Sequence, residues 1–214
     1  MGDEARIHPI LYAISSLVLR PLFRTVYRLR RGGGHNVPAT GPVLFVSNHV
    51  SGMDPPLLGA GALPRRLHFM AKKELFAHPV ASWIISRVGA FPVDRGAADR
   101  NAIRVAKAVL NRGDALLMFP EGTRSAPDHV APLKKGPFHL AAEARVPILP
   151  VAVIGSAQVL RPHDWRIHPG LISVRVGTPI PTEGYSDDDA GREALRERVA
   201  EALEALMQKG HIPA

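Results

Sequence analysis

A histidine and an aspartate follow a short apolar run in the stretch SNHVSGMDPP, residues 47–56, and both suit proton transfer. One ring nitrogen of a histidine takes a proton from an alcohol when a carboxylate holds the other and stabilises the imidazolium that forms. His49 and Asp54 are close enough in sequence for this pairing, and Asn48 could hold the turn by a hydrogen bond. The alternative is structural, with Asp54 as the N-cap of a following helix and His49 as part of that cap.

The sequence offers no nucleophile of its own for this base to activate. It contains no cysteine, and Ser47, Ser51 and Ser125 lie near the polar stretches without the G-x-S-x-G context of a nucleophile elbow. The hydroxyl that His49 activates is therefore expected to belong to the substrate.

A metal centre is another chemistry that these residue types allow. His49, Asp54, His68 and Glu121 are all of metal-ligating types. However, the chain has no H-E-x-x-H motif and no two histidines four positions apart. We therefore expect no metal, and the absence of cysteine excludes disulfides and cysteine-ligated zinc.

Two arginines near other apolar runs are candidates for binding an anion. Arg95 lies in GAFPVDRG, and Arg124 lies in FPEGTRS. Guanidinium groups that converge from separate strand ends can clamp a phosphate. In the second stretch, Gly122 allows close backbone approach and Thr123 offers a hydroxyl. Glu121 is expected to accept a bond from a substrate hydroxyl or to orient Arg124, the alternative being a purely structural Glu–Arg pair.

Short apolar runs alternate with helical segments, and these elements must position the polar side chains. Strands are expected at residues 43–46, 67–71, 90–93, 115–119, 148–154 and 171–176. Helices are expected at residues 74–88, 97–111, 136–144 and 188–208. The alternation predicts an α/β fold with a mostly parallel sheet flanked by helices. Because ligands bind outside the carboxyl ends of such strands, the polar clusters that follow three of them should form one site.

The charge balance predicts an anionic partner. The 214 residues, enough for one α/β domain, carry 27 Lys and Arg against 19 Asp and Glu, a net charge of +8. Lys134 and Lys135 add to this charge just before the helix expected at 136–144. We expect no nucleic-acid partner, because such proteins usually add exposed aromatic residues to a basic face, and aromatic residues make up only 6% of this chain.

Residues 1–34 are expected to form a basic amphipathic helical membrane-association segment, followed by a catalytic domain over 35–214. The uncharged stretch 8–19 is too short to span a bilayer. An apolar stripe from Ile7 to Leu29 and a separate line of arginines are typical of a helix lying in the membrane interface. The alternative is an ordinary helix packed on the domain. The expected location is peripheral or monotopic, on the cytoplasmic face of a membrane.

Four blocks occur in an order that points to a known family. They are Asn48-His49 with Asp54, GAFPVDRG with Arg95, FPEGTRS, and VPILPVAVIG with Pro147 and Pro150. Together they resemble the glycerolipid acyltransferase family, especially the 1-acylglycerol-3-phosphate acyltransferases, and they span residues 48–155, half of the chain.

The resemblance implies an α/β acyltransferase domain that moves a fatty acyl group from acyl-CoA or acyl carrier protein to a lysophospholipid hydroxyl. It implies His49 as general base with Asp54 as its partner, and no cofactor beyond the co-substrate. Arg95, with Asn48 and the block from Glu121 through Arg124, would bind substrate. Pro147 and Pro150 would shape the acyl pocket or the structure. Membrane lipids are the expected partners.

Alternatives remain for the acceptor and for the class of protein. In the first block only Ser51 matches the Gln-Ser that often follows the histidine in lysophosphatidate enzymes. Another lysophospholipid, an ornithine-type lysolipid or a glycolipid is therefore an alternative acceptor. A serine lipid hydrolase and a non-enzymatic membrane-binding protein are the other candidates.

The acyl-chain pocket has one candidate wall in the sequence. The expected helix at 74–88 carries Phe76, Val80, Trp83 and Ile84. These side chains are expected to line the pocket or, as the alternative, to pack in the ordinary core.

Overall fold

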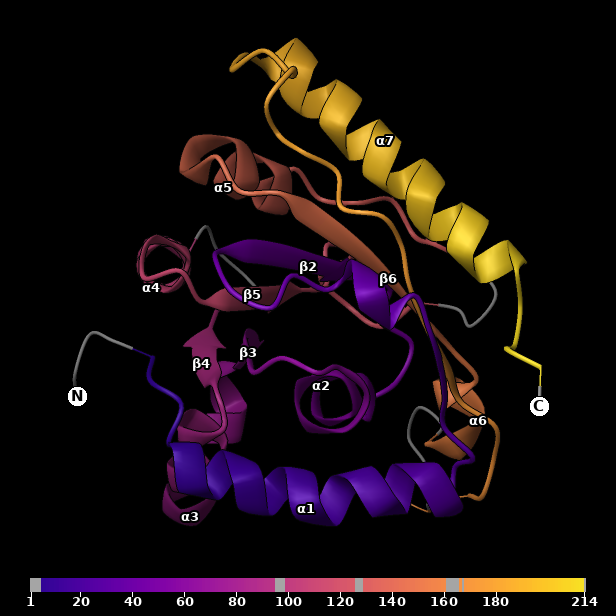
Figure 1. The fold of residues 1–214 in the computed structure, drawn as a ribbon. Helices are drawn as coiled ribbons and strands as arrows, with labels where there is room; N and C mark the ends of the chain where they lie inside the picture. The colour runs from indigo at the N-terminus through magenta and orange to yellow at the C-terminus, as the bar shows by residue number, and fades with distance from the viewer. Residues whose placement is uncertain (1–4, 95–98, 126–128, 161–165, 167, 214) are drawn as a thin grey trace.

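The computed structural model describes the chain except for residues 1–4, 95–98, 126–128, 161–165, 167 and 214. Its centre is a seven-stranded sheet in the order β1-β7-β6-β2-β5-β3-β4 (Figure 1). The strands are β1 Arg30–Gly32, β2 Val43–Ser47, β3 Leu67–Lys72, β4 Ala90–Val93, β5 Ala115–Met118, β6 Ile148–Ile154 and β7 Ser173–Val176. All neighbouring pairs are parallel except β6 and β7. The predicted mostly parallel sheet flanked by helices is confirmed.

Helices cover both faces of the sheet (Figure 1). Those with at least eight residues are α1 Pro9–Thr25, α3 Pro79–Arg87, α4 Arg100–Asn111, α5 Gly136–Ala144 and α7 Asp189–Gln208. The shorter ones are α2 Asp54–Pro56, α6 Ser156–Val159, the π-helical turn η2 Leu57–Ala62, and the 3₁₀ turns η1 Gly34–Asn36 and η3 Lys73–Phe76.

The central strand β2 is buried on both faces, which is why its sequence is a continuous apolar run. Successive side chains of a strand point to opposite faces. Leu44 and Val46 accordingly join the core under α4, α5 and α7, whereas Val43 and Phe45 join the core that α1 and η2 cover. The sheet is therefore held rigidly from both sides, and the loops at its carboxyl edge start from fixed positions.

The N-terminal helix is shorter than we predicted and is attached to the domain. α1 continues through Pro21 and ends at Thr25. Arg30–Gly32 form the edge strand β1 beside β7. The ring of Phe23 is fully buried against η2, where a Cβ added to Gly61 would start 2.6 Å from it. The Tyr12 hydroxyl also donates a hydrogen bond to the carbonyl of Gly59. In the described residues, the helices all lack the combination of length and apolar character that crossing a membrane requires.

The segment predicted as one helix over 74–88 is divided into η3 and α3. Pro79 opens α3, and His78 before it is extended, with φ −88° and ψ 122°. A proline restricts the preceding residue to extended conformations and is itself favoured in the first helical turn. The other predicted helices and strands match the observed ones to within a few residues.

Candidate active site

The site begins where three neighbouring strands end. β6, β2 and β5 lie side by side in parallel, so the loops after them meet at one edge of the sheet. The loop after β2 carries His49 and leads into α2, which begins at Asp54. Phe119 and Glu121 follow β5, and Ser156 follows β6. The predicted clustering of polar residues at the carboxyl edge is therefore observed for the loops after β2 and β5, whereas Arg95 of the predicted cluster after β4 lies outside the described residues.

His49 and Asp54 form the pair that their spacing suggested. His49 Nδ1 lies 3.0 Å from Asp54 Oδ2, and the same oxygen accepts the backbone N–H groups of Val50 and Ser51, both at 2.8 Å. A carboxylate accepts a hydrogen bond from Nδ1–H, so Nε2 is the ring nitrogen that can accept a proton. Asp54 accepts hydrogen bonds from residues that precede it, and Met53 holds the N-cap position of α2. The alternative in which Asp54 is the N-cap of the following helix is therefore wrong.

The His49 ring is fixed from a second direction by Phe119. The two rings stack with their centroids 4.4 Å apart and an angle of 29° between their planes. Asp54 is fully buried and His49 is 5% exposed, so little water competes for their hydrogen bond. The His49 ring is therefore held in one orientation by hydrogen bonding at Nδ1 and by stacking on its face.

One carboxylate oxygen of Glu121 holds the backbone of His49, while the other has no hydrogen-bond partner among the described residues, so its bond to a substrate hydroxyl stays a prediction. Its Oε2 accepts the His49 N–H at 3.2 Å and the hydroxyl of Ser125, and the Ser125 N–H donates to the His49 carbonyl at 2.8 Å. Burial raises the pKa of Glu121, while the Ser125 hydroxyl and the His49 N–H act to lower it. Neither the predicted orientation of Arg124 nor the structural Glu–Arg pair is present between these residues. Glu121 thus joins the loop after β5 to the loop that carries the base.

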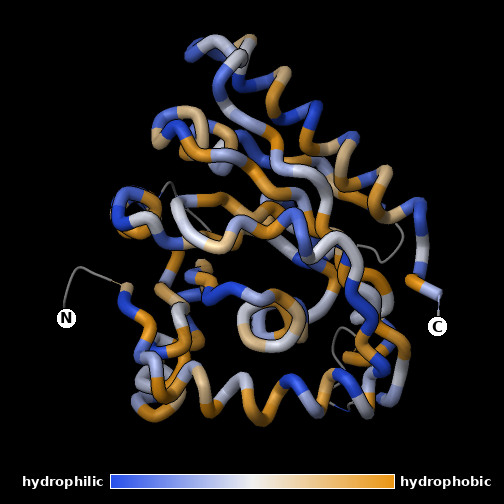
Figure 2. Tube along the Cα trace, in the orientation of Figure 1, coloured by the Kyte–Doolittle hydropathy of each residue, from blue (hydrophilic) through white to orange (hydrophobic). Residues whose placement is uncertain are grey.

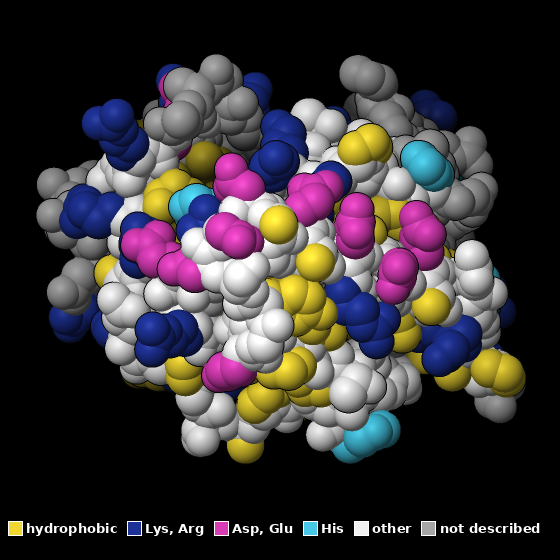
Figure 3. Space-filling view, turned by 90° about the horizontal axis from the view of Figure 1, so that it is seen from above, with side chains coloured by type: hydrophobic (Ala, Val, Ile, Leu, Met, Phe, Trp, Pro, Cys, Tyr) yellow, Lys and Arg dark blue, Asp and Glu magenta, His cyan; other side chains and the backbone are white. Residues whose placement is uncertain are grey.

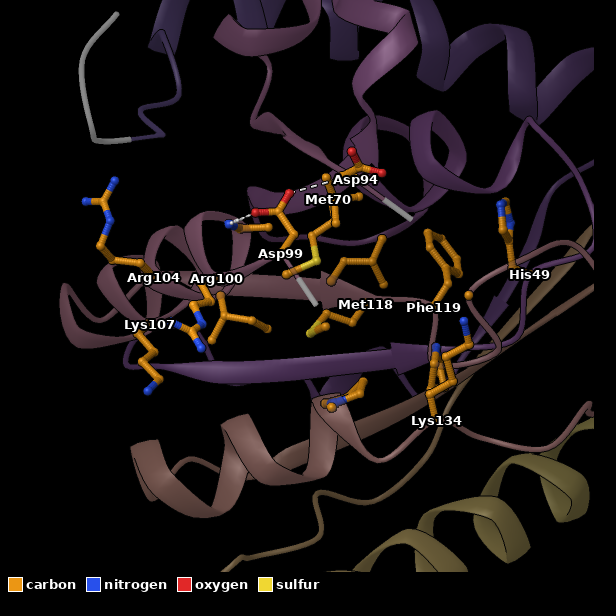
Figure 4. A pocket seen from close by; sticks show the side chains of 18 residues that line it. His49, Met70, Asp94, Asp99, Arg100, Arg104, Lys107, Met118, Phe119 and Lys134 are labelled. Carbon is orange, nitrogen blue, oxygen red and sulfur yellow. Dashed lines mark hydrogen bonds between the residues drawn. The ribbon is translucent and has the colours of Figure 1, made fainter. Parts of the chain in front are cut away.

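A pocket of about 710 Å³ opens beside His49 (Figure 4). Figure 4 shows His49, Phe119 and Lys134 toward one end, with the cationic side chains of Arg100, Arg104 and Lys107 at the other. The wall between them is largely apolar and comes from strands β3, β4 and β5 and from α4 and α5. Its apolar residues include Met70, Val93, Ala102, Ile103, Leu117, Met118 and Pro137. The His49 imidazole, an apolar space and several cationic side chains therefore share one cavity.

Lys134 is a site residue to which the sequence analysis gave no role. Gly122 has φ 75°, and a Cβ added there would lie 2.6 Å from Lys134 Nζ, so the ammonium rests against the glycine backbone. The Lys134 N–H is anchored to the Pro120 carbonyl at 2.9 Å. Within the described part of the chain, its ammonium has no hydrogen-bond or ion-pair partner. The only sequence signal for this residue was the pair of lysines before the helix at 136–144. The fold is needed to show that Lys134 lines the pocket and Lys135 does not.

The predicted arginine clamp is not seen in the described residues. Thr123 and Arg124 are exposed and do not line the pocket. Arg95 lies outside the described residues. Gly122 does line the pocket, as its predicted role in close backbone approach requires. Substrate binding by Thr123, Arg124 and Arg95 stays a prediction.

Asn48 makes structural hydrogen bonds and does not line the pocket, and its substrate binding stays a prediction. Its side-chain N–H donates to the Val153 carbonyl at 2.9 Å, and its Oδ1 accepts the Val153 N–H at 2.8 Å. The residue is fully buried, so both polar atoms are already satisfied away from the pocket. Asn48 therefore ties the loop after β2 to the end of β6.

Pro147 and Pro150 also act in the sheet and do not line the pocket. The Pro147 carbonyl accepts the Leu44 N–H at 3.0 Å, and Pro150 lies in β6 opposite Val46. Of the two roles considered for them, the structure supports the structural one.

The helix proposed as a wall of the acyl pocket lies elsewhere. Val80, Trp83 and Ile84 are exposed on α3, so they neither line the pocket nor pack in the core. Both interpretations of these three residues are wrong, because the outer face of α3 has no other element over it in the described structure.

The four residues of metal-ligating types do not form a metal site among the described residues. His68 lies near the start of β3, 3.5 Å from Asp114, whereas His49 follows the carboxyl end of β2. Burial lowers the pKa of His68 to about 4, which keeps this distant histidine neutral near pH 7. Among the described residues, no three His, Asp or Glu side chains gather as a metal site would require.

The serines near the base have other hydrogen-bond partners. The hydroxyl of Ser51 donates to the Leu160 carbonyl, that of Ser47 to the Asn48 carbonyl, and that of Ser125 to Glu121. No described serine therefore presents its hydroxyl to the His49 ring, which argues against the serine hydrolase alternative.

Ser156 is a second residue that the sequence analysis missed. Its hydroxyl donates to Asp54 Oδ1 at 2.6 Å, and the residue is fully buried. Gly155 before it has φ 90°, which turns the chain back toward the loop after β2. The residues are 102 positions apart, so only the pairing of β6 with β2 reveals the contact.

Replacing Ser156 with alanine should lower turnover about tenfold and the free energy of unfolding by about 1–2 kcal/mol, because a buried carboxylate oxygen loses its donor. Steady-state kinetics and thermal unfolding measure the two effects. Ser186→Ala, which removes a hydroxyl bonded to an exposed aspartate, is the matched control. Unchanged kinetics for Ser156→Ala would show that Asp54 needs no support at this oxygen.

Fold and site define a class of α/β protein in which a buried histidine–aspartate pair at the carboxyl edge of the sheet faces an apolar pocket. A family model described as Acyltransferase matches residues 28–154. The 1-acyl-sn-glycerol-3-phosphate acyltransferase alpha of Homo sapiens is 36% identical over 183 residues, covering 82% of this chain and 62% of the human protein. The chain belongs to the acyltransferase family, as the four sequence blocks suggested.

Two bacterial proteins extend the comparison. The 1-acyl-sn-glycerol-3-phosphate acyltransferase of Bacillus subtilis is 30% identical over 174 residues, covering 81% of this chain and 82% of that protein. The crystal structure of the 1-acyl-sn-glycerophosphate acyltransferase from Thermotoga maritima has a TM-score of 0.74 and 28% identity. That match covers 96% of this chain and 81% of the other. The chain spans about three fifths of the human relative's length.

Proposed function

We propose that this protein transfers a fatty acyl group from a thioester to the free hydroxyl of 1-acylglycerol-3-phosphate, giving phosphatidate for phospholipid synthesis. The observation that carries the proposal is the His49–Asp54 pair facing an apolar pocket that Lys134 also lines. Relatives named for this reaction support the choice of acceptor.

His49 acts as the general base in the proposed reaction. Its Nε2 takes the hydroxyl proton while the acceptor oxygen attacks the thioester carbonyl carbon. The carbon–sulfur bond then breaks, and the departing sulfur takes the proton from the imidazolium. Asp54 stabilises the imidazolium during these steps, because its Oδ2 holds the Nδ1 proton. The attacking hydroxyl and the thioester carbonyl both come from the substrates. The proposed mechanism therefore includes no acyl-enzyme, and it includes no metal or cofactor.

The apolar wall of the pocket supports placing the acyl chain of one substrate beside the base. Met70, Met118 and Ile103 belong to this wall, and burying methylenes there stabilises the complex by about 0.8 kcal/mol each. The donor in the proposal is acyl-CoA or acyl carrier protein.

The acceptor's phosphate is proposed to bind Lys134. The hydroxyl and the phosphate of the acceptor lie on a three-carbon glycerol unit, so the phosphate must remain close to His49 when the hydroxyl reaches Nε2. Lys134 lines the same pocket and rests against Gly122, whose N–H is held by the Phe119 carbonyl at 3.1 Å. An ammonium without another partner is suited to a phosphate monoester.

Replacing Lys134 with glutamine should raise the KM for lysophosphatidate about tenfold or more, with a much smaller effect on the KM for the acyl donor. Lys135→Gln is the matched control, because Lys135 is also exposed but does not line the pocket. Equal KM changes for donor and acceptor, or equal effects of both variants, would contradict a phosphate-binding role for Lys134.

The function itself is tested by thiol release from oleoyl-CoA, with and without lysophosphatidate, followed by mass spectrometry of the lipid product. Release that requires the acceptor and yields phosphatidate is expected. Acyl carrier protein donors and a panel of other lysolipids form the parallel arms. Transfer to one of those lysolipids in place of lysophosphatidate would keep the reaction but overturn the acceptor.

The protein is proposed to reach its lipid substrate by peripheral attachment to the cytoplasmic face of a membrane through residues 1–34. Exposed apolar residues of α1, among them Ile14 and Leu17, support this proposal, as do the exposed Arg20 and Arg24 on the same helix. Basic residues near a membrane surface favour anionic lipids.

A further inference from the structure

The exposed large apolar side chains of the described residues are confined to two segments of the chain. Five lie on or next to α1, and four lie on η3 and α3. Isolated exposed apolar residues are ordinary, but a gathered set marks an interaction surface. The set is Ile10, Ile14, Leu17, Val18, Val26, Leu75, Val80, Trp83 and Ile84, here called the α1–α3 apolar set.

The two segments belong to one end of the molecule. α1 and α3 contact each other, and the His8 N–H at the start of α1 donates to the Arg87 carbonyl at the end of α3, at 2.8 Å. Figure 1 shows α3 beside the N-terminal end of α1, on the side of the sheet away from α7. The two helices therefore hold a fixed relation to each other through the folded domain.

Each helix turns an apolar face outward. Ile10, Ile14 and Leu17 recur at helical spacing on α1, and hydrophobic residues alternate with hydrophilic ones along this helix (Figure 2). Leu17 is 75% exposed, whereas Tyr12 and Phe23 on the inner face are buried. α1 is thus apolar on both its inner and its outer face. An ordinary surface helix would expose mainly polar residues.

On α3, Trp83 is 50% exposed and lies next to Ile84. The Arg87 guanidinium lies 4.4 Å from the centroid of the Trp83 ring. A tryptophan stacked with an arginine combines an apolar body with a cation, a combination suited to the boundary between lipid headgroups and acyl chains.

The charges near these helices fit an anionic lipid surface. Neither α1 nor α3 contains Asp or Glu, while Arg20, Arg24 and Arg87 belong to them. The face on the α7 side, in contrast, carries a band of Asp and Glu side chains among Lys and Arg (Figure 3). A second copy of this chain on the α1–α3 apolar set would bring the same arginines together, whereas anionic lipids would neutralise them.

We infer that α3 docks on the membrane together with α1, so that the α1–α3 apolar set contacts one leaflet of an anionic bilayer. The inference deepens the proposed membrane attachment, which named only residues 1–34. It assigns Trp83 and Ile84, which the sequence analysis placed in the acyl pocket or the core, to lipid contact.

Fluorescence of Trp83 tests the inference directly, because the chain has two tryptophans and Trp165→Phe leaves Trp83 as the reporter. In vesicles of phosphatidylcholine and phosphatidylglycerol with brominated acyl chains, its emission should fall about twofold or more relative to unbrominated vesicles. The control reporter is Ala205→Trp in a protein carrying Trp83→Phe and Trp165→Phe. Ala205 is exposed on α7, away from α1 (Figure 1), and its reporter should remain unquenched.

Sedimentation with the same vesicles gives an independent measurement. The combined variant Val80→Gln, Trp83→Gln and Ile84→Gln should lower the partition coefficient about tenfold or more. Its thermal unfolding should be unchanged, because these side chains are exposed.

Two outcomes would overturn the inference. One is unquenched Trp83 in protein that sediments with vesicles, which would leave α1 to dock alone. The other is lipid-free dimerisation that the triple variant abolishes, which would make the surface a contact between copies. Because neither measurement requires acyl transfer, loss of the proposed activity with retained quenching would count against the function and not against docking.

Discussion

His49→Ala is expected to reduce acyl transfer by about 10³-fold or more while the protein remains folded. The ring contributes one proton-accepting nitrogen to the pocket, and no other described histidine lines that cavity. The loop around it should persist, since Asp54 also accepts the N–H groups of Val50 and Ser51. Thiol release and phosphatidate formation measure the loss, and circular dichroism with thermal unfolding checks the fold.

His139→Ala is the matched control, because His139 is exposed on α5 and does not line the pocket. Its activity should equal that of the unaltered protein. A His49→Ala protein with near-normal turnover would remove the base from the mechanism, whatever the activity of the control.

Asp54→Asn should lower turnover about 10²-fold to 10³-fold and also destabilise the protein. An amide can present an N–H where the carboxylate now accepts His49 Nδ1, which would favour the wrong ring tautomer. The amide also has one oxygen to serve hydrogen bonds that now converge on two oxygens, from Val50, Ser51 and Ser156. We expect a fall of about 1–3 kcal/mol in the free energy of unfolding.

Asp188→Asn is the matched control for the change of a carboxylate to an amide. Asp188 is an exposed N-cap whose Oδ1 accepts the Gly191 N–H at 2.8 Å at the start of α7. Asparagine is also a good N-cap, so little change in stability and none in turnover is expected. If Asp54→Asn lowered stability but left kcat and its pH profile unchanged, Asp54 would be a structural residue of the loop and no part of the catalytic pair.

Local sequence pattern was sufficient to predict most of the fold and the contact between His49 and Asp54. The continuous apolar run of β2 and the turn after it are short-range signals, and the His49–Asp54 contact closes within that turn. The edge strand β1 was missed because three residues with two arginines lack an apolar pattern. It forms only because β7 lies beside it.

The parts of the site that sequence could not supply depend on contacts between distant residues. Ser156 meets Asp54 across 102 positions, and Lys134 meets Gly122 only after the loop following β5 folds back. The sequence analysis also wrongly placed the exposed residues of α3 in the acyl pocket or the core. An apolar periodicity shows that a helix has an apolar face, but it does not show whether protein or another medium covers that face.

Because the buried ring of Phe23 packs against Gly61, α1 is a fixed part of the folded domain and does not act as a flexible tether. Under the proposed docking, the position of His49 relative to the lipid headgroups is then fixed by the fold. The protein cannot change that position by extending a linker, so any distance between the headgroups and His49 has to be covered by the lysolipid. A lysolipid with a short acyl chain leaves the bilayer more easily than one with a long chain. With α1 fixed to the domain, the free energy needed to move a lysolipid out of the bilayer thus contributes to substrate selectivity, separately from the shape of the pocket.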